Sequence, residues 1–384
     1  MKLLYISEDY INSQVHHQLL QTIAKLQPDC QTTVFSIKRD NQCKDIHGTY
    51  SPVDYFVSIR ELQSAENKLN SSPFLYKYLF PYKIKRKYAL LQESVDVKSQ
   101  DYIFAATLFS EGALAYQIHQ DYKIPYMVAV RGSDVNFYLK YMPHLWKLGR
   151  EIIENACAVV FLSETIKKQL LNSSAFSKMA KMLQEKSVVI CNGIDKFWIK
   201  NRFSDIKTLN YNVLYVGRMD RNKNVETLIK ACNLVRQWFP QLHLNLVGEG
   251  GNRETEVKKM AAERSWITMH GGVYDKEKLK ELFRSNDLFA MISHSETFGL
   301  VYVEALSQGL PVVFTKNQGI DGFFSENIGV AVNSDSAENV ATSIAQLFEE
   351  YAEVQKSVVN LDLSRFQWSA IAQQYFSLFL KIFS

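Results

Sequence analysis

The chain has 384 residues, of which 47% are hydrophobic and 22% are charged. These values are typical of folded globular proteins, and the length suits two domains of ordinary size. The 44 Lys and Arg residues nearly balance the 40 Asp and Glu residues, so the net charge of +4 does not indicate a nucleic-acid-binding protein. The cysteines number five, an odd count without a Cys-x-x-Cys pair, which indicates reduced thiols rather than disulfides or a metal site.

The sequence shows no features of a secretory leader or a membrane span. Glu8 and Asp9 interrupt the first apolar run. No later apolar stretch reaches the roughly 18 residues that a spanning helix needs. We therefore expect a cytoplasmic protein that touches a membrane only at its surface, on the inner face.

The first half of the chain alternates short apolar runs with segments of helical periodicity. Lys2 to Ser7 has the composition of a buried strand, and Ser13 to Leu26 follows with apolar spacing near 3.6. Further strand-like runs occur at residues 32–37, 102–106, 126–130, 158–162 and 187–190. Strands that alternate with helices predict a parallel, doubly wound sheet. We predict a Rossmann-like α/β domain over residues 1–200.

The same alternation starts again at Val213, after a polar stretch. Strands are predicted at 213–216, 242–247, 267–269, 288–292 and 311–314, and helices at 224–238, 253–263, 276–285, 300–308 and 336–350. This predicts a second Rossmann-like domain over residues 201–365. Residues 366–384 have helical apolar spacing and are expected to form a packing helix rather than a membrane anchor. Ligands of such sheets bind beyond the carboxyl ends of the strands, so we expect the site between the domains.

Residues 295–311 place two glutamates around a glycine-containing turn. Glu296 precedes the turn at Phe298-Gly299, and Glu304 lies in a predicted short helix that ends near Gly309. Backbone N–H groups at such a turn, with the positive end of a helix, can face a diphosphate. The two carboxylates are then available to accept hydrogen bonds from hydroxyls. Taken alone, each glutamate is more often an ordinary surface residue.

Two cations follow the first strand of the second domain. Gly217, Arg218 and Lys223 lie between that strand and a predicted helix. Arg offers a fixed fork for phosphate oxygens and Lys a point charge, and a diphosphate leaving group needs such compensation. An isolated pair would more often be surface charge. Combined with the segment of Glu296 and Glu304, one domain length later, the pair is more often functional.

The sequence gives no indication of a metal cofactor. No Asp-x-Asp pair occurs, although this is the common carboxylate arrangement for holding a divalent metal on a nucleotide diphosphate. His16 and His17 are adjacent, and adjacent side chains on a helix diverge, so they are not expected to bind one ion together. We therefore expect metal-independent chemistry.

The order and spacing of these motifs resemble retaining glycosyltransferase family 4. The resemblance covers nearly the whole chain and is strongest from 213 to 315. It rests on Gly-Arg-x-x-x-x-Lys at 217–223, Val-Gly-Glu-Gly at 247–250, Gly-Gly-Val at 271–273, Ser-Glu-Thr-Phe-Gly-Leu-Val-Tyr-Val-Glu-Ala at 295–305 and Gly-Leu-Pro-Val-Val at 309–313. In the first half, Val-Arg-Gly-Ser-Asp at 130–134, Leu-Ser-Glu at 162–164 and Asn-Gly-Ile-Asp at 192–195 follow the family's order.

This resemblance implies the GT-B fold, in which two Rossmann-like domains face a central cleft and a C-terminal helix crosses back to the first domain. It also implies retaining transfer of a sugar from a nucleotide diphosphate sugar to an acceptor hydroxyl. The first domain would bind a glycan or lipid-linked acceptor, and the second would bind the donor. Surface polysaccharide or glycolipid assembly is the expected setting.

The resemblance further implies a role for each residue that matches its motifs. Arg218 and Lys223 would hold the donor diphosphate, and Glu304 would accept hydrogen bonds from the ribose. Glu296 would contact the hydroxyls of the donor sugar near the reacting carbon. Phe298, Gly299 and Leu300 would present backbone amides to the donor, and Gly272 and Val273 would lie against the nucleotide base. Gly217 would also line the donor site.

Two positions in the first half depart from the family pattern. The loop from Glu8 to Ser13 contains no glycine, whereas the family usually has paired glycines there. Arg131 stands where the family commonly has His. Arg131 would bind an acidic sugar or an acceptor phosphate in one interpretation. In the other, equally good, it forms an ion pair with Asp134 or another carboxylate.

A basic, aromatic segment runs from Asn67 to Gln92. It contains Lys and Arg residues interleaved with Tyr and Phe, and no Asp or Glu. Such a surface, centred on Lys77 to Tyr88, would suit an anionic membrane or a lipid-diphosphate acceptor. The alternative is a solvated basic helix whose tyrosines pack on the first domain.

Three other functions fit part of the sequence. Glycoside hydrolysis by Glu296 and Glu304 would leave Arg218 and Lys223 without a task. Epimerisation of a nucleotide sugar on the same fold fits somewhat better. A catalytically silent subunit that binds a nucleotide sugar would explain Arg131 and the missing glycines, but not the complete motifs of the second domain.

Overall fold

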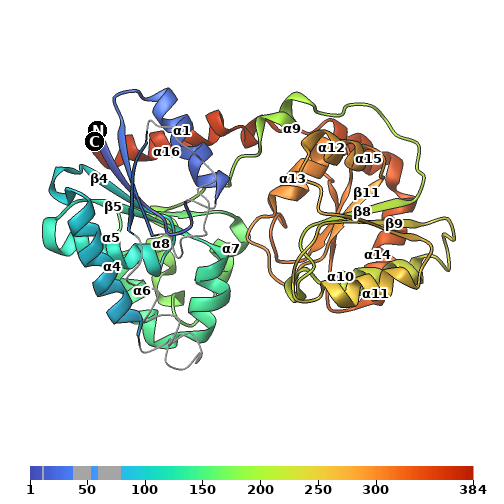
Figure 1. Cartoon of the computed structure of the whole chain (residues 1–384), viewed down its shortest axis with the longest axis horizontal. Coiled ribbons are helices and arrows are strands. Elements are labelled where there is room, and N and C mark those ends of the chain that lie inside the picture. Colours follow the sequence, from blue (N-terminus) through green and yellow to red (C-terminus); the bar gives the residue numbers. More distant parts are fainter. Residues whose placement is uncertain (11–12, 38–52, 59–78, 384) are drawn as a thin grey trace. The chain divides into compact units, whose positions relative to one another are not determined.

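The computed structural model describes residues 1–10, 13–37, 53–58 and 79–383 (Figure 1). These residues form two compact units. Unit 1 comprises Met1–Leu162, Ile166–Gly193 and Trp368–Ser384, and unit 2 comprises Ser163–Thr165 and Ile194–Gln367. The first boundary lies a few residues before position 200 because Ile194 is already bonded within unit 2, where its N–H donates to the carbonyl of Phe366 at 3.0 Å.

A parallel sheet with the strand order β3-β2-β1-β4-β5-β6-β7 forms the core of unit 1. Every residue of β4, β5 and β6 is buried. This is expected for parallel strands that are covered on both faces by helices. The strands are β1 (Lys2–Ile6), β2 (Gln31–Ile37), β3 (Val53–Ser58), β4 (Tyr102–Ala105), β5 (Tyr126–Val130), β6 (Ala158–Phe161) and β7 (Ser187–Val189).

Helices cover both faces of this sheet (Figure 1). They are α1 (Gln14–Leu26), α4 (Phe80–Ser94), α5 (Ser110–Tyr122), α6 (Trp146–Asn155), α7 (Glu164–Leu171), α8 (Ala180–Lys186) and α16 (Trp368–Phe383). The C-terminal helix α16 lies beside α1, and its Phe379 packs edge-on against Tyr102 of β4, with ring centroids 5.5 Å apart. The C-terminal helix therefore returns to the first sheet, as predicted.

Unit 2 repeats this architecture around a second parallel sheet, with the strand order β10-β9-β8-β11-β12-β13. The strands are β8 (Asn212–Val216), β9 (His243–Val247), β10 (Ile267–Gly271), β11 (Leu288–Met291), β12 (Val312–Thr315) and β13 (Gly329–Val332). The helices are α9 (Lys196–Lys200), α10 (Val225–Val235), α11 (Glu254–Ala262), α12 (Lys276–Arg284), α13 (Leu300–Ser307), α14 (Ala337–Glu349) and α15 (Tyr351–Val359). The predicted fold class, two doubly wound parallel α/β domains, is confirmed.

The strand order reverses direction once in each sheet. In unit 1 the reversal lies between β1 and β4, and in unit 2 it lies between β8 and β11. In parallel sheets such a reversal sends the loops of the neighbouring strands toward opposite faces, and ligands bind in the crevice beyond the carboxyl ends. We call these two places the switch points of unit 1 and unit 2.

Glycines allow the loops at the switch point of unit 2 to approach each other closely. Gly248 follows β9 and has a φ of +134°. A Cβ atom at this position would lie 1.9 Å from the carbonyl oxygen of Gly217, which follows β8. Any side chain would therefore push the two loops apart. Gly250 has a φ of +73°, but a Cβ atom there would meet nothing within 4 Å.

Gly248 and Gly250 give a matched test of the close approach between the loops after β8 and β9. Gly248→Ala should destabilise unit 2 by about 2–5 kcal/mol, because a positive φ costs about 1–2 kcal/mol and forced overpacking about 1–3 kcal/mol. Gly250→Ala should cost only about 1–2 kcal/mol, because only the positive φ is unfavourable at that position. Urea unfolding followed by circular dichroism measures both losses. Equal losses would contradict the proposed clash at Gly248.

Candidate functional site

A salt bridge spans the switch point of unit 2. Lys223 ends a short turn of 3-10 helix after β8, and Glu296 lies on the loop after β11. The Lys223 Nζ atom lies 2.8 Å from Glu296 Oε2, and the two side chains are only 23% and 16% exposed. Sequence analysis assigned both residues to the donor site. The structure brings them into direct contact.

Neighbouring residues fix the two loops to each other. The Asp220 carboxylate accepts the backbone N–H of Lys223 at 3.1 Å. Asn222 accepts the N–H of Ser295 at 3.0 Å through its side-chain oxygen and donates to the carbonyl of Ser295 at 2.9 Å. Asn222 thus ties the Lys223 loop to the Glu296 loop. Sequence analysis missed this residue, whose only signal was its place beside Lys223.

The turn between Glu296 and α13 presents backbone rather than side chains. Gly299 has a φ of +82°, and a Cβ atom there would lie 2.5 Å from the Tyr302 ring. Phe298 is 2% exposed, with its ring packed edge-on against Phe323. No side chain caps the first turn of α13, which starts at Leu300. The backbone N–H groups of the first turn of α13 are therefore available to a ligand, as expected for an anion site.

Arg218 is exposed on the loop after β8. Its carbonyl accepts the Tyr215 hydroxyl at 2.6 Å, and the neighbouring Gly217 N–H donates to the carbonyl of Val247 at 2.9 Å. These bonds fix the backbone at both positions. The exposed Arg218 side chain therefore extends from a loop whose backbone is held by hydrogen bonds.

Glu304 lies on α13 in a partly buried environment. The indole of Trp198, on α9, hydrogen bonds to its carboxyl group. Burial raises the pKa of Glu304 to about 7, and the nearby Asp195 carboxylate also raises it. Asp195 itself pairs with Lys276 at 2.6 Å. Glu304 therefore changes charge near neutral pH.

The loop after β10 contains Gly272 and Val273, both partly exposed. A Cβ atom at Gly272 would lie 2.6 Å from the carboxyl carbon of Glu249. The hydroxyl of Tyr274, a residue that is 83% exposed, donates to the same carboxylate at 2.8 Å. Glu249 and Tyr274 thus flank the strip of backbone that was predicted to contact the nucleotide base.

The raised pKa of Glu304 predicts pH-dependent nucleotide binding. A carboxylate accepts two ribose hydrogen bonds, whereas the protonated form does so less well, so the affinity should rise with pH. A group with a pKa of about 7 is about one-tenth ionised at pH 6 and nine-tenths at pH 8, so the Kd should fall up to about tenfold across that interval. Calorimetric titration with UDP, GDP and ADP at pH 6 and pH 8 measures the Kd values.

The control for this experiment is Glu304→Gln. This variant cannot ionise at position 304, so any remaining pH dependence comes from the phosphates of the nucleotide or from other groups. An identical pH profile in the wild-type protein and Glu304→Gln would rule out ionisation of Glu304 as the cause.

At the carboxyl end of β5 in unit 1, Arg131 and Asp134 do not form the ion pair that sequence analysis considered. The Asp134 carboxylate instead accepts the backbone N–H of Arg131 at 2.8 Å and that of Phe109 at 3.2 Å. The Arg131 Nε atom donates to the carbonyl of Ala106 at 2.7 Å, and Nη2 lies 3.4 Å from His16. Asp134 is fully buried, and this burial raises its pKa to about 7.

The adjacent histidines of α1 point to different partners. His16 Nδ1 bonds to the Tyr5 hydroxyl, and His17 Nδ1 bonds to the Tyr10 hydroxyl at 2.9 Å. Within the residues that the structure describes, no group of three or more His, Cys, Asp or Glu is placed to hold a metal ion.

The basic, aromatic segment is described only in part. Residues 67–78 lie outside the described residues, and Phe80 to Gln92 belong to α4. Tyr82 is 57% exposed and Lys85 is exposed, whereas Lys83 and Lys87 are buried. The helix therefore has one exposed basic face and one buried basic face. For the described part of the chain, no helix has both the length and the apolar composition needed to cross a membrane.

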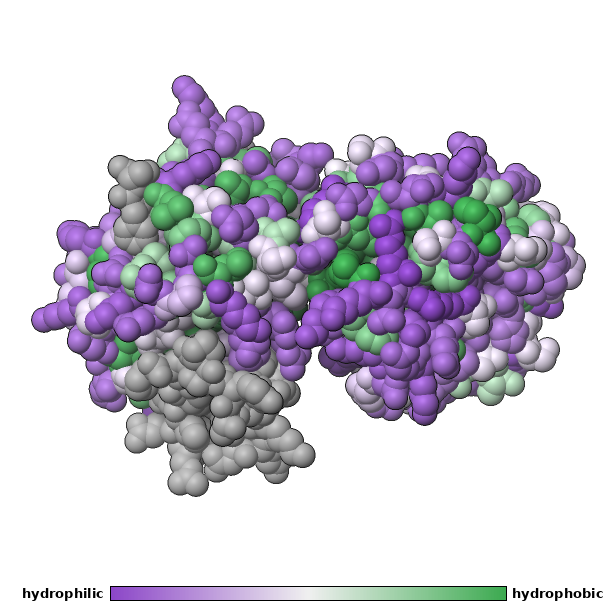
Figure 2. Space-filling view, turned by 90° about the horizontal axis from the view of Figure 1, so that it is seen from above, coloured by the Kyte–Doolittle hydropathy of each residue, from purple (hydrophilic) through white to green (hydrophobic). Residues whose placement is uncertain are grey.

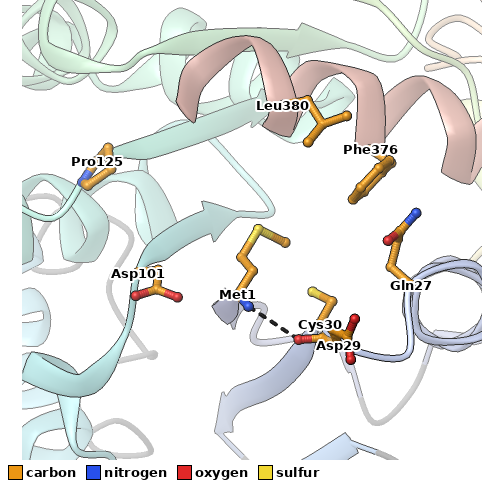
Figure 3. Close-up of a pocket in the computed structure, with 8 residues that line it drawn as sticks. All are labelled: Met1, Gln27, Asp29, Cys30, Asp101, Pro125, Phe376 and Leu380. Carbon is orange, nitrogen blue, oxygen red and sulfur yellow. Dashed lines mark hydrogen bonds between the residues drawn. The ribbon is translucent and has the colours of Figure 1, made fainter. Parts of the chain in front are cut away.

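A cavity of about 650 Å³ lies elsewhere in unit 1 (Figure 3). It is lined mainly by apolar surface from Met1, Cys30, Pro125, Phe376 and Leu380, with Gln27, Asp29 and Asp101 at its edges. These residues precede the strands or belong to α16, so the cavity lies at the amino ends of the strands. It is therefore not the switch-point crevice. On the face that Figure 2 shows, hydrophobic residues form small groups among hydrophilic ones.

The amino-acid sequence of unit 2 matches a known family. Residues 196–360 match the family described as "Glycosyl transferases group 1". This part of the chain is a glycosyl transferases group 1 domain. The match contains every residue of unit 2 that sequence analysis assigned to the donor site.

Two relatives extend this similarity. A D-inositol 3-phosphate glycosyltransferase from Pseudarthrobacter chlorophenolicus is 34% identical over 149 residues, which are 37% of this chain and 35% of that protein. A putative teichuronic acid biosynthesis glycosyltransferase, TuaC from Bacillus subtilis, is 25% identical over 264 residues, or 68% of this chain and 64% of that protein. The matches thus span less than two thirds of either relative.

Solved structures share the fold along the whole chain. HepE from Anabaena, in complex with UDP and glucose, superposes with a TM-score of 0.68 at 19% identity, covering 99% of this chain and 100% of that one. Sucrose-phosphate synthase from Thermosynechococcus elongatus gives 0.71 at 20% identity, covering 100% and 99%. The fold is therefore that of GT-B glycosyltransferases.

Proposed function

We propose that the chain is a glycosyltransferase that moves a sugar from a nucleotide diphosphate sugar to an acceptor hydroxyl, with retention of anomeric configuration and without a required metal. The observation that carries this proposal is the salt bridge between Lys223 and Glu296 at the switch point of unit 2. Its surroundings supply uncapped backbone N–H groups at Leu300 and a second cation at Arg218. The group 1 domain that contains these residues supports the same conclusion.

In this proposal the donor lies with its diphosphate beside Arg218 and Lys223. Negative charge develops on the diphosphate as the bond to the sugar breaks, and these cations, with the first turn of α13, stabilise it. Glu296 accepts hydrogen bonds from hydroxyls of the sugar, and Glu304 accepts them from the ribose. Neither glutamate acts as an acid, because the diphosphate leaves as a stable anion.

The remaining parts of the mechanism concern the base and the acceptor. Gly272 and Val273 contact the base through backbone and a small side chain, beside Glu249. The acceptor, a glycan or a lipid-linked sugar, binds unit 1, where Arg131 contacts an acidic group. Departing phosphate takes the proton of the acceptor hydroxyl, and exclusion of water limits hydrolysis of the donor. We place this reaction in surface polysaccharide or glycolipid assembly, with contact to the inner face of a membrane through the segment from Lys77 to Tyr88.

Removal of the Lys223 charge tests the leaving-group role. Lys223→Met should lower kcat about 10²–10³-fold, because losing one preorganised donor to a developing oxyanion costs about 2.7–4 kcal/mol. Single-turnover assays with the UDP-, GDP- or ADP-sugar that the protein binds best measure this. Lys230→Met, on an exposed position of α10, is the control and should retain full activity. A kcat for Lys223→Met within threefold of wild type would contradict the role.

The stereochemistry of the product tests the reaction class. We expect the new glycosidic bond to keep the anomeric configuration of the donor, and activity to persist in excess EDTA. Proton NMR of the first product, before any mutarotation of free sugar, distinguishes retention from inversion. An inverted product, or complete loss of activity in EDTA that Mg²⁺ restores, would contradict the mechanism. Donor binding without turnover across a broad acceptor panel would favour a silent subunit instead.

A further inference from the structure

The switch point of unit 1 also contains a Lys–Glu salt bridge. Lys87 of α4 pairs with Glu8, which follows β1. The pair is nearly enclosed, since the Lys87 and Glu8 side chains are only 10% and 19% exposed. Glu8 belongs to the loop that lacks the glycines of the family pattern. This loop is therefore built around a charge pair rather than around bare backbone.

The loop is also anchored on the other side of the crevice. The backbone N–H of Glu8 donates to Glu111 Oε1 at 3.1 Å, and Glu111 lies in the first turn of α5, after β4. Glu111 is 3% exposed and also accepts hydrogen bonds from Thr107 and Ser110. Burial, and then the nearby Glu8, raise the pKa of Glu111.

The helix that supplies Lys87 has an unusual buried face. The buried residues of α4 are Phe80, Lys83, Lys87 and Leu91, which share one side of the helix. Lysines are almost never buried unless a charge or a ligand compensates them, because desolvation of the ammonium is costly. Two lysines thus lie in the middle of an otherwise apolar stripe, and Glu8 compensates the charge of Lys87.

One further group at this place is unsatisfied. Ser7, directly after β1, is 1% exposed, and its hydroxyl has no hydrogen-bond partner among the described residues. Buried hydroxyls usually bond to protein, water or ligand. The end of β1 therefore has an unused donor beside the Lys87–Glu8 pair, at the edge where parallel sheets bind their ligands.

We propose that the switch-point crevice of unit 1 binds an anionic group of the acceptor, a phosphate or a carboxylate, through Lys87 and Lys83. In the absence of acceptor, Glu8 holds the Lys87 ammonium in place. The incoming oxyanion takes over this ammonium, which releases the Glu8 carboxylate to accept a hydrogen bond from an acceptor hydroxyl. This inference rests on the proposed function and names the subsite that binds the acidic group of the acceptor.

Titration with inorganic phosphate tests the subsite directly. The full-length chain carrying Arg218→Met and Lys223→Met is used, so that the proposed donor site does not contribute. In this background, Lys87→Met or Lys83→Met should weaken phosphate binding at least tenfold. Lys85→Met, on the exposed face of the same helix, should change it less than twofold. No binding at millimolar phosphate, or an equal loss in Lys85→Met, would overturn the proposal.

Glu8→Gln gives a test whose expected result, tighter phosphate binding, cannot arise from misfolding. It removes the carboxylate that competes for Lys87 but keeps the backbone N–H that bonds to Glu111. Phosphate should therefore bind at least threefold more tightly. An unchanged or weaker affinity would mean that the Lys87–Glu8 pair is purely structural, and the proposal would fail.

The source of the oxyanion is identified by repeating the titration with a soluble hexose phosphate, a hexuronate and a polyprenyl phosphate in detergent micelles. Binding of the preferred ligand must depend on Lys87; an affinity that Lys87→Met leaves unchanged overturns the subsite. Because the donor site is disabled in these proteins, the outcome is independent of sugar transfer. Failure of the proposed function would appear instead as absent turnover in the wild-type chain.

Discussion

The salt bridge between Lys223 and Glu296 joins two loops that the strand order of unit 2 sends to opposite faces of the sheet. Without this contact, each residue would present an uncompensated, half-buried charge at the crevice. Because both side chains remain partly exposed, a ligand that has both an anion and hydroxyls can exchange partners with them. The pair thus keeps the two side chains oriented before a ligand arrives, which reduces the reorganisation that binding requires.

Backbone packing makes this arrangement possible. Gly217 and Gly248 let the loops after β8 and β9 touch, and Asn222 ties the loop after β8 to the loop after β11. Gly299 lets the chain turn over the Tyr302 ring into α13. Several chain segments therefore meet at one edge of the sheet with few side chains between them. These close approaches leave the uncapped first turn of α13 and the Lys223–Glu296 pair at this edge, which suits a diphosphate better than an apolar ligand.

Most of the fold could be predicted from the sequence, because buried parallel strands are almost continuous apolar runs. The two strands that were missed, β3 and β13, lie at sheet edges. β13 has only four residues, Gly329–Val332, and its glycine sits against β12, where a Cβ atom would lie 2.0 Å from the Val312 oxygen. Local periodicity does not reveal this close packing of a glycine against the neighbouring strand. Predicting β13 therefore requires knowing which strand it pairs with.

The residues of the candidate site likewise divide into those that the sequence alone can identify and those that it cannot. Lys223, Glu296 and Glu304 could be named because their motifs are local in sequence. Asn222 and Trp198 could not, since their importance arises from contacts with segments that fold against them from far along the chain. The alternative of an ion pair between Arg131 and Asp134 failed for a related reason: backbone N–H groups compete for the Asp134 carboxylate, and sequence spacing does not record them.

Both units have a Lys–Glu salt bridge at the switch point, but the lysine and the glutamate come from different elements in the two units. In unit 2 the lysine follows the first strand and the glutamate follows the strand across the reversal, whereas in unit 1 the glutamate follows the first strand and a helix supplies the lysine. A Lys–Glu pair at each switch point keeps a polar crevice open within a sheet that is otherwise apolar, because neither charge can be buried alone. The glycine-free loop from Glu8 to Ser13 is then consistent with the rest of unit 1. A loop that presents a carboxylate against a buried lysine is suited to exchange with an oxyanion, and bare glycine backbone would not compete for that lysine.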